Sequence, residues 1–165
     1  MTRITFIVPF IAFVVFSYGQ ESKLYEEVES AFLRSKQENY YDKGRFMWSA
    51  CNVDSSFYRS GTVHLFSNSS FPFNNKCYET AIIIFNSLTK GYITENVSSP
   101  EYGTSGSRIA NKSDKFKFSI SQSGNYVFIT FLNSTKRKYK FQVISVKNLN
   151  EHGAKGTQLT LLRSG

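Results

Sequence analysis

The chain contains two histidines, the residue type that most often transfers protons in catalysis near neutral pH. His64 lies in a short apolar segment over 62–66, and His152 is followed by a glycine. A secreted nuclease or esterase could use such a pair as general acid and general base. However, no Gly-x-Ser-x-Gly turn, His-Glu-x-x-His helix or paired cysteine and histidine accompanies them. We therefore expect a strand histidine, a loop histidine and no enzyme activity.

Metal and cofactor chemistry has little support in the composition. Two cysteines exclude a zinc module built on four cysteines, and two histidines leave few ligands for a histidine-based site. Gly103 and Gly106 are not followed by the lysine and hydroxyl residue of a phosphate-binding loop. We expect no metal and no cofactor.

Basic side chains are the second feature that could bind a partner. Twenty Lys and Arg against twelve Asp and Glu give a net charge of +8. The local centre is a predicted hairpin tip with four basic residues: Lys136, Arg137, Lys138 and Lys140. Such a cluster could hold an acidic glycan such as a glycosaminoglycan, or an extracellular host protein. Alternatively, the lysines keep an exposed hairpin soluble and protect a strand edge.

The first nineteen residues indicate the compartment. Arg3 precedes an apolar run over 4–16, and small residues stand at Ser17 and Gly19. This pattern predicts a secretory signal peptide over 1–19, followed by a single domain over 20–165. The run is shorter than the roughly 20 residues that a bilayer requires, so we expect no membrane span. Secretion argues against nucleic acid as a partner.

Two further features agree with secretion. Cys51 and Cys77 would form one disulfide in an oxidising compartment. Four N-x-S/T sequons lie in predicted loops and mark candidate glycosylation sites: Asn68, Asn96, Asn111 and Asn133. We therefore expect an extracellular glycoprotein.

Hydrophobic periodicity divides the chain into one helix and a series of strands. Leu24, Val28 and Phe32 recur at helical spacing and predict an amphipathic helix over 21–36. Alternating segments separated by turn residues predict strands over 45–52, 57–66, 77–86, 90–96, 106–111, 115–121, 125–133, 137–147 and 157–163. Because most connections are short, sequential strands should pair antiparallel. We predict an all-β fold, an antiparallel up-and-down barrel with a short N-terminal helix; the alternative is a two-sheet β-sandwich.

Aromatic residues make up 16% of the chain and suggest a binding cavity. Barrels of about eight strands often leave room for one small ligand. The candidate lining is Phe118, Phe128, Tyr139 and Phe141. An acidic group inside such a cavity would point to an amine as ligand. The alternative is a fully packed core.

The order of these segments resembles a secreted lipocalin, nearest the salivary type of blood-feeding arthropods. A helix over 24–33 precedes Gly44-Arg-Phe-Met-Trp48, and Phe116-Lys-Phe-Ser and Asn125-Tyr-Val-Phe-Ile precede a strand over 139–146. The resemblance implies that Trp48 closes the barrel base with Arg163 stacked on it. It also implies capture of a small amphipathic mediator, a biogenic amine or a lipid.

A second resemblance is to the Golgi-dynamics (GOLD) type of β-sandwich. It rests on Cys77-Tyr-Glu, Pro100-Glu-Tyr-Gly103 and the segment over 116–131, in that order. The sequence thus leaves two functions open. The leading one is capture of a small amphipathic ligand in a barrel; the other is binding of an acidic glycan or a host protein through the basic hairpin.

Overall fold

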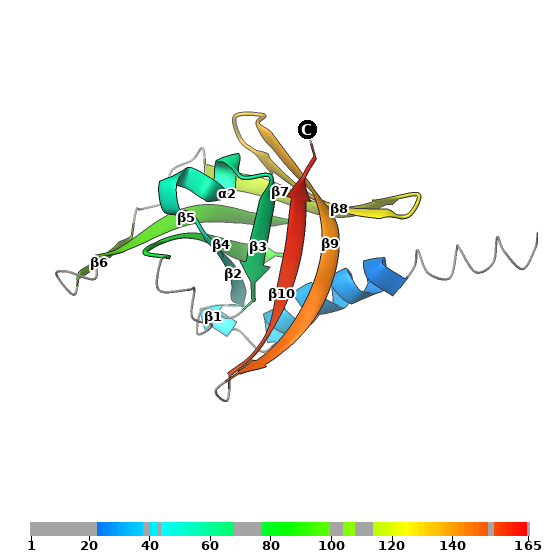
Figure 1. Cartoon of the computed structure of the whole chain (residues 1–165), viewed down its shortest axis with the longest axis horizontal. Helices are drawn as coiled ribbons and strands as arrows, with labels where there is room; N and C mark the ends of the chain where they lie inside the picture. The colour runs from blue at the N-terminus through cyan, green and yellow to red at the C-terminus, as the bar shows by residue number, and fades with distance from the viewer. Residues whose placement is uncertain are drawn as a thin grey trace, which may run out of the picture.

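The computed structural model describes residues 23–37, 40–42, 44–67, 77–99, 104–107, 114–151 and 154–164. The predicted signal peptide, His152 and the sequons at Asn68 and Asn111 lie outside these ranges, as does the side chain of Asn96. The described residues form an N-terminal helix over 23–37 followed mainly by antiparallel strands (Figure 1). The prediction of an all-β fold with an N-terminal helix is confirmed.

The strands and the second helix have the following bounds. The first half contains β1 (Tyr40–Asp42), β2 (Arg45–Cys51), the 3-10 turn η1 (Val53–Ser55), α2 (Ser56–Arg59), β3 (Thr62–Phe66), β4 (Glu79–Ser87) and β5 (Lys90–Ser99). The second half contains β6 (Thr104–Ser107), β7 (Lys115–Ser123), β8 (Tyr126–Asn133), β9 (Lys138–Glu151) and β10 (Ala154–Arg163).

Eight of these strands form a closed ring. The hydrogen-bonded order is β2-β3-β10-β9-β8-β7-β5-β4, and β4 pairs back onto β2. β1 and β6 extend the sheet from β2 and β5. The order departs from a strictly up-and-down sequence at one place, because β2 lies between β3 and β4.

Two pairs of neighbouring strands in the ring are joined over only a few residues. β2 meets β3 through Ser49 opposite Phe66, and β5 meets β7 only over residues 90–92 and 115–117. The other neighbours pair over longer stretches, and β10 pairs with β9 over its whole length, from top to bottom in Figure 1. The pairing of β7 with β5 ends at Lys117. On that side of β7 the next residue, Phe118, bonds to the β4–β5 turn, because its backbone N donates to Thr89 O at 2.8 Å.

Aromatic and aliphatic side chains fill the inside of the ring. Trp48, Phe46, Phe85 and Phe141 each have 0% of their surface exposed, and the N-terminal helix adds Phe32 at 1%. The Phe32 ring contacts three strands, with its centroid 4.7 Å from Trp48, 5.5 Å from Phe85 and 4.8 Å from Phe118. The helix is therefore part of the core and not an appendage.

Three of the predicted strands need correction. The prediction of a strand over 57–66 is wrong for its first part, because residues 56–59 form α2. Polar side chains fix this turn: Asn52 Oδ1 accepts from Phe57 N at 3.2 Å, and Ser56 Oγ donates to Cys51 O at 3.1 Å. The second difference lies at β9 and β10, which extend over residues that we expected to form a loop.

Candidate functional site

The four aromatic residues predicted to line a cavity do not share one surface. Phe118 and Phe141 are buried inside the ring, and Tyr139 is half-buried on the same side. Phe128 lies on the outer face of β8, where Lys140 Nζ is 3.8 Å from its ring centroid. Phe128 therefore cannot line a site with the other three.

The space around the inward residues is largely occupied. Phe131 lies between two of them, with its ring centroid 5.4 Å from Phe118 and 6.2 Å from Phe141. Tyr139 borders a hollow of about 50 Å³ that Tyr58 and Phe131 also line. One water molecule occupies about 30 Å³ in the liquid, so this hollow is too small for an organic ligand.

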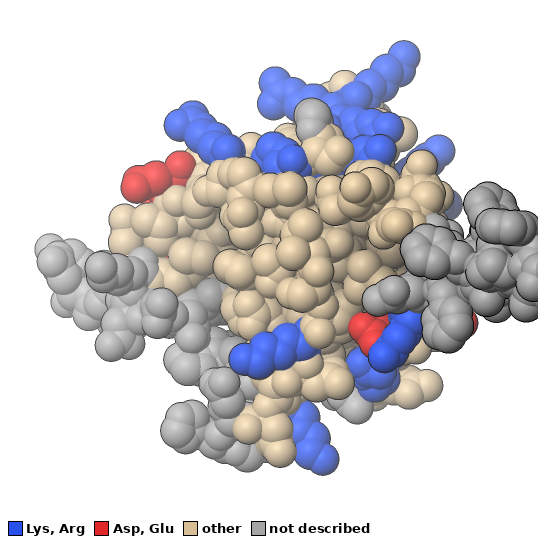
Figure 2. Space-filling model, turned by 45° about the vertical axis from the view of Figure 1, so that its right-hand side comes forward, with Lys and Arg blue, Asp and Glu red and all other residues tan. Residues whose placement is uncertain are grey.

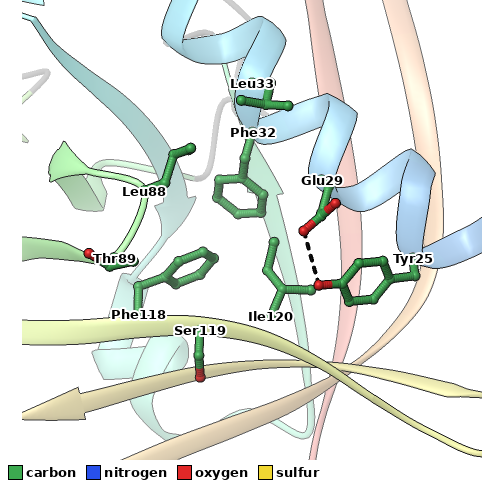
Figure 3. A pocket seen from close by; sticks show the side chains of 9 residues that line it. All are labelled: Tyr25, Glu29, Phe32, Leu33, Leu88, Thr89, Phe118, Ser119 and Ile120. Carbon is green, nitrogen blue, oxygen red and sulfur yellow. Dashed lines mark hydrogen bonds between the residues drawn. The ribbon is translucent and has the colours of Figure 1, made fainter.

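A larger hollow lies between the N-terminal helix and β7 (Figure 3). Its volume is about 340 Å³, at the lower end of the range for small-molecule sites. We call it the helix groove; its lining is Tyr25, Glu29, Phe32, Leu33, Leu88, Thr89, Phe118, Ser119 and Ile120. In Figure 3 the side chains of Phe32, Phe118 and Ile120 converge, whereas Ser119 points to the other side of β7.

Local sequence patterns explain how these residues meet. Tyr25, Glu29 and Phe32 recur at helical spacing, which places them on one side of the helix. Phe118 and Ile120 are two apart on β7, so both point to the side that faces the helix. Leu88 and Thr89 enter from the β4–β5 turn, where Ser87 Oγ accepts from Thr89 N at 3.3 Å.

Glu29 gives the helix groove a negative charge at its mouth. Tyr25 Oη donates to Glu29 Oε1 at 2.9 Å, and this hydrogen bond, with burial and the nearby carboxylate, raises the pKa of Tyr25. No lysine or arginine of the described ranges lies within ion-pair distance of Glu29. The carboxylate is thus oriented by a phenol and available to a cation.

The basic hairpin residues lie at the β8–β9 turn, as predicted. Lys136, Arg137 and Lys138 are exposed, and Lys140 is half-buried over Phe128. Figure 2 shows lysine and arginine side chains gathered at the upper end of the molecule, where Figure 1 places this turn.

The sequon residue Asn133 shapes the same turn. Its Oδ1 accepts from the backbone N of Arg137 at 2.8 Å and from that of Thr135 at 3.1 Å. The hydroxyl of Thr135 donates to the same oxygen at 2.8 Å.

The remaining predicted residues have structural partners. His64 is exposed on β3, with Nδ1 3.1 Å from Gln158 Nε2 and 3.3 Å from Thr160 Oγ1. Among the residues that the structure places, no group of three His, Cys, Asp or Glu side chains could hold a metal ion. The predicted disulfide between Cys51 and Cys77 is confirmed, and it joins the end of β2 to the segment before β4.

The expected stacking of Arg163 on Trp48 is wrong. The Arg163 guanidinium lies 4.8 Å from the Phe141 ring centroid and donates to Phe57 O and Ser60 O at 2.6 and 3.1 Å. Partial burial lowers the pKa of Arg163. Trp48 instead stacks on Phe32, because the N-terminal helix occupies the place beside it.

Comparisons with known proteins do not assign the chain to a family. No family model matches the chain, and no curated protein or solved structure is significantly similar to it. No helix of the described ranges is long and apolar enough to cross a membrane. The functional argument therefore depends on the site itself.

Sequence reasoning missed the acidic part of the helix groove. Tyr25 and Glu29 are one helical turn apart, a spacing that predicts their hydrogen bond. That signal was present in the sequence, but only the contact with β7 shows that the pair borders an apolar hollow.

Proposed function

We propose that this chain is a secreted binding protein that holds a small amphipathic molecule in the helix groove, with a cationic group of the ligand at Glu29. One observation carries the proposal: an apolar hollow of about 340 Å³ has a carboxylate at its mouth in a chain of net charge +8. Binding sites of this size usually combine apolar walls with few polar groups, and the polar groups fix orientation.

The walls supply the attraction for the apolar part of the ligand. Leu88 and the half-buried Ile120 offer aliphatic surfaces, and the edges of the largely buried Phe32 and Phe118 rings also line the hollow. Apolar burial contributes roughly 25 cal/mol per Å², so a ligand with one aromatic ring gains several kcal/mol before its ordering costs. An ammonium group near Glu29 would also lie near the phenol oxygen of Tyr25, which can accept a hydrogen bond.

This proposal modifies the cavity predicted from sequence. The ring interior is filled by aromatic side chains, so we place the ligand at the edge of the ring and not inside it. The closed eight-strand ring gives the groove a fixed wall, and the N-terminal helix gives it the other. We propose binding without catalysis.

Secretion belongs to the same proposal. The Cys51–Cys77 disulfide supports it, since disulfides persist mainly in oxidising compartments. The sequence adds the predicted signal peptide over 1–19 and four sequons. The prediction that all four lie in loops is wrong for two of them, because Asn133 ends β8 next to the β8–β9 turn and Asn96 lies in β5.

The test is calorimetric titration of the mature protein with phenethylamine and with its neutral analogue phenylethanol. We expect the amine to bind more tightly, and Glu29→Gln to lower its affinity about two- to fivefold, the value of one ion pair at an exposed carboxylate. Glu26→Gln is the matched control, because Glu26 is exposed on the same helix and does not line the hollow.

Equal binding of the amine and the neutral analogue would contradict the role of Glu29. No binding by either, nor by a fatty acid of similar size, would remove the helix groove as a ligand site. Retention on heparin that requires Lys136, Arg137 and Lys138 would then favour the second function, a protein that binds an acidic glycan through the basic hairpin.

A further inference from the structure

Three lysines on neighbouring strands form a charged surface that sequence order does not reveal. Lys90 on β5 is opposite Lys117 on β7, Lys117 is opposite Leu132 on β8, and Leu132 is opposite Lys138 on β9. We call Lys90, Lys117 and Lys138 the lysine row. All three are exposed, and the row lies on the outer face of the ring, because the residues on either side of Lys117 point into the core. Neighbouring strands are about 4.8 Å apart, so the row extends about 14 Å across the sheet.

Protection of a strand edge does not explain the lysine row. Lys117 is paired on both sides, with β5 and with β8, so this part of β7 has no free edge. Like charges directly opposite each other destabilise a sheet, and Lys90 and Lys117 form such a pair. No acidic side chain of the described ranges forms an ion pair with any of the three lysines. An anion bound along the row would relieve the repulsion.

Hydroxyl groups lie beside the lysine row on the same face. Ser119 on β7 is opposite Thr130 on β8, two residues further along each strand than Lys117 and Leu132. The lysines and these hydroxyls line one open hollow of about 560 Å³ on the outer face of the ring. Its full lining is Thr89, Lys90, Lys117, Phe118, Ser119, Thr130, Leu132 and Lys138. The surface therefore offers cations and hydrogen-bonding hydroxyls side by side.

The lining favours one class of polyanion over two others. Phe118 is the aromatic residue of the lining and is only 5% exposed, so it offers no ring face on which a nucleic-acid base could stack. Leu132 is the exposed apolar residue of the lining, at 39%, and a single leucine is a poor anchor in a membrane surface. Sulfate groups match the lysines in charge, and sugar hydroxyls match Ser119 and Thr130 in hydrogen bonding.

We propose that the lysine row binds a sulfated polysaccharide whose chain crosses β5, β7, β8 and β9 on the outer face of the ring. Its sulfate groups lie at Lys90, Lys117 and Lys138, whose flexible ammonium groups act as mobile point charges. This inference goes beyond the proposed function and does not depend on it, because the helix groove lies on the other face of β7.

The site differs from the basic hairpin that the sequence predicts. The two share Lys138, but Lys136 and Arg137 belong to the β8–β9 turn and do not line the hollow. Lys90 and Lys117, which do line it, come from strands outside the hairpin. Substitutions at the two places can therefore distinguish the sites.

The experiment is calorimetric titration of the mature protein with a heparin hexasaccharide at low ionic strength. N-glycans are removed first, because the sequon residue Asn133 follows Leu132 in β8. We expect the double variant Lys90→Gln/Lys117→Gln to lower the affinity about fivefold, the value of two exposed ion pairs. Lys36→Gln/Lys147→Gln is the matched control, since it removes the same charge from exposed lysines outside the hollow and should change the affinity less than twofold.

Thermal unfolding of the same variants is the second readout. Lys90→Gln/Lys117→Gln removes two like charges that face each other, so without ligand it should melt at the wild-type temperature or slightly above it. The hexasaccharide should raise the melting temperature of the wild type more than that of this variant. Weaker binding together with unchanged or higher stability excludes misfolding as the cause.

Four outcomes would overturn the inference. An equal loss of affinity in the control variant would mean that only net charge matters. A loss in Lys136→Gln/Arg137→Gln but not in Lys90→Gln/Lys117→Gln would move the site to the hairpin. Unchanged affinity for desulfated heparin would remove the sulfate contacts. Tighter binding of single-stranded DNA or of phosphatidylserine vesicles than of the hexasaccharide would contradict the class of partner. Amine binding at the helix groove should be the same in every variant, which separates this test from that of the proposed function.

Discussion

Two regions along β7 differ in how their apolar side chains are covered. Phe116 lies inside the ring against Phe131 and Phe85, with ring centroids at 5.1 and 5.6 Å, and is 4% exposed. Ile120, four residues further on the same face, borders a hollow of about 340 Å³. One strand thus passes from a filled core to an open groove within five residues.

The difference follows from what lies beside the strand. Phe116 sits where β5, β7 and β8 are hydrogen-bonded, and a continuous sheet brings side chains from both neighbours over it. Ile120 lies past the end of the β5–β7 pairing, where cover comes from the N-terminal helix and the β4–β5 turn. These two segments cover Ile120 incompletely, so it stays half-buried.

The largest difference between the two regions is expected in the free energy of unfolding when a large side chain in each is replaced by alanine. Phe131→Ala removes a ring that is 1% exposed and contacts Phe116, Phe118 and Phe141, so we expect a loss of about 3–5 kcal/mol in the free energy of unfolding. Ile120→Ala should cost less than about 1.5 kcal/mol, because its side chain already borders open space. Urea denaturation with the disulfide intact measures both losses; equal losses would contradict the distinction between core and groove.

A smaller effect is expected where the two regions meet. A Cβ added at Gly91 would lie 2.7 Å from Phe116 Cζ and would also collide with the backbone oxygen of Ile84. We expect Gly91→Ala to lower the free energy of unfolding by about 1–3 kcal/mol, the usual cost of overpacking. Gly61→Ala is the control, because no atom lies within 4 Å of its added Cβ. A loss no larger than that of Gly61→Ala would show that the junction yields and is not tightly packed.

The local elements could be predicted because they depend on local patterns. The spacing of Val28 and Phe32 predicted the N-terminal helix, and alternation along β7 predicted a strand with the correct inward residues. For β8 the strand itself was predicted, but not its inward face. The Cys51–Cys77 disulfide also followed from the composition and the expected compartment. Short polar turns between β7, β8 and β9 made their antiparallel pairing a necessary consequence.

The candidate site could not be predicted because it depends on contacts between distant segments. Lys90 and Lys117 become neighbours only through the pairing of β5 with β7, which covers three residues on each strand. That Glu29 and β7 line the same hollow likewise requires the helix to pack against the ring, as Phe32 does against Phe118. Phe128 was misplaced for a simpler reason: its strand is apolar on both faces, so alternation did not show which face is inward.

The smallest predicted effect concerns the titration of Tyr25 in the helix groove. The hydrogen bond from Tyr25 to Glu29 raises the pKa of the phenol above its ordinary value of about 10, because a phenolate would lie beside a carboxylate. The folded state thus favours the protonated phenol, and this contribution is present below about pH 10 and is lost as the pH rises through the raised pKa. Glu29→Gln should lower the pKa of Tyr25. NMR titration of ¹³C-labelled tyrosine measures this pKa, and the Tyr25→Phe variant identifies the Tyr25 signal. An unchanged titration would mean that solvent screens the pair, and the carboxylate would then attract a ligand cation no better than any exposed glutamate.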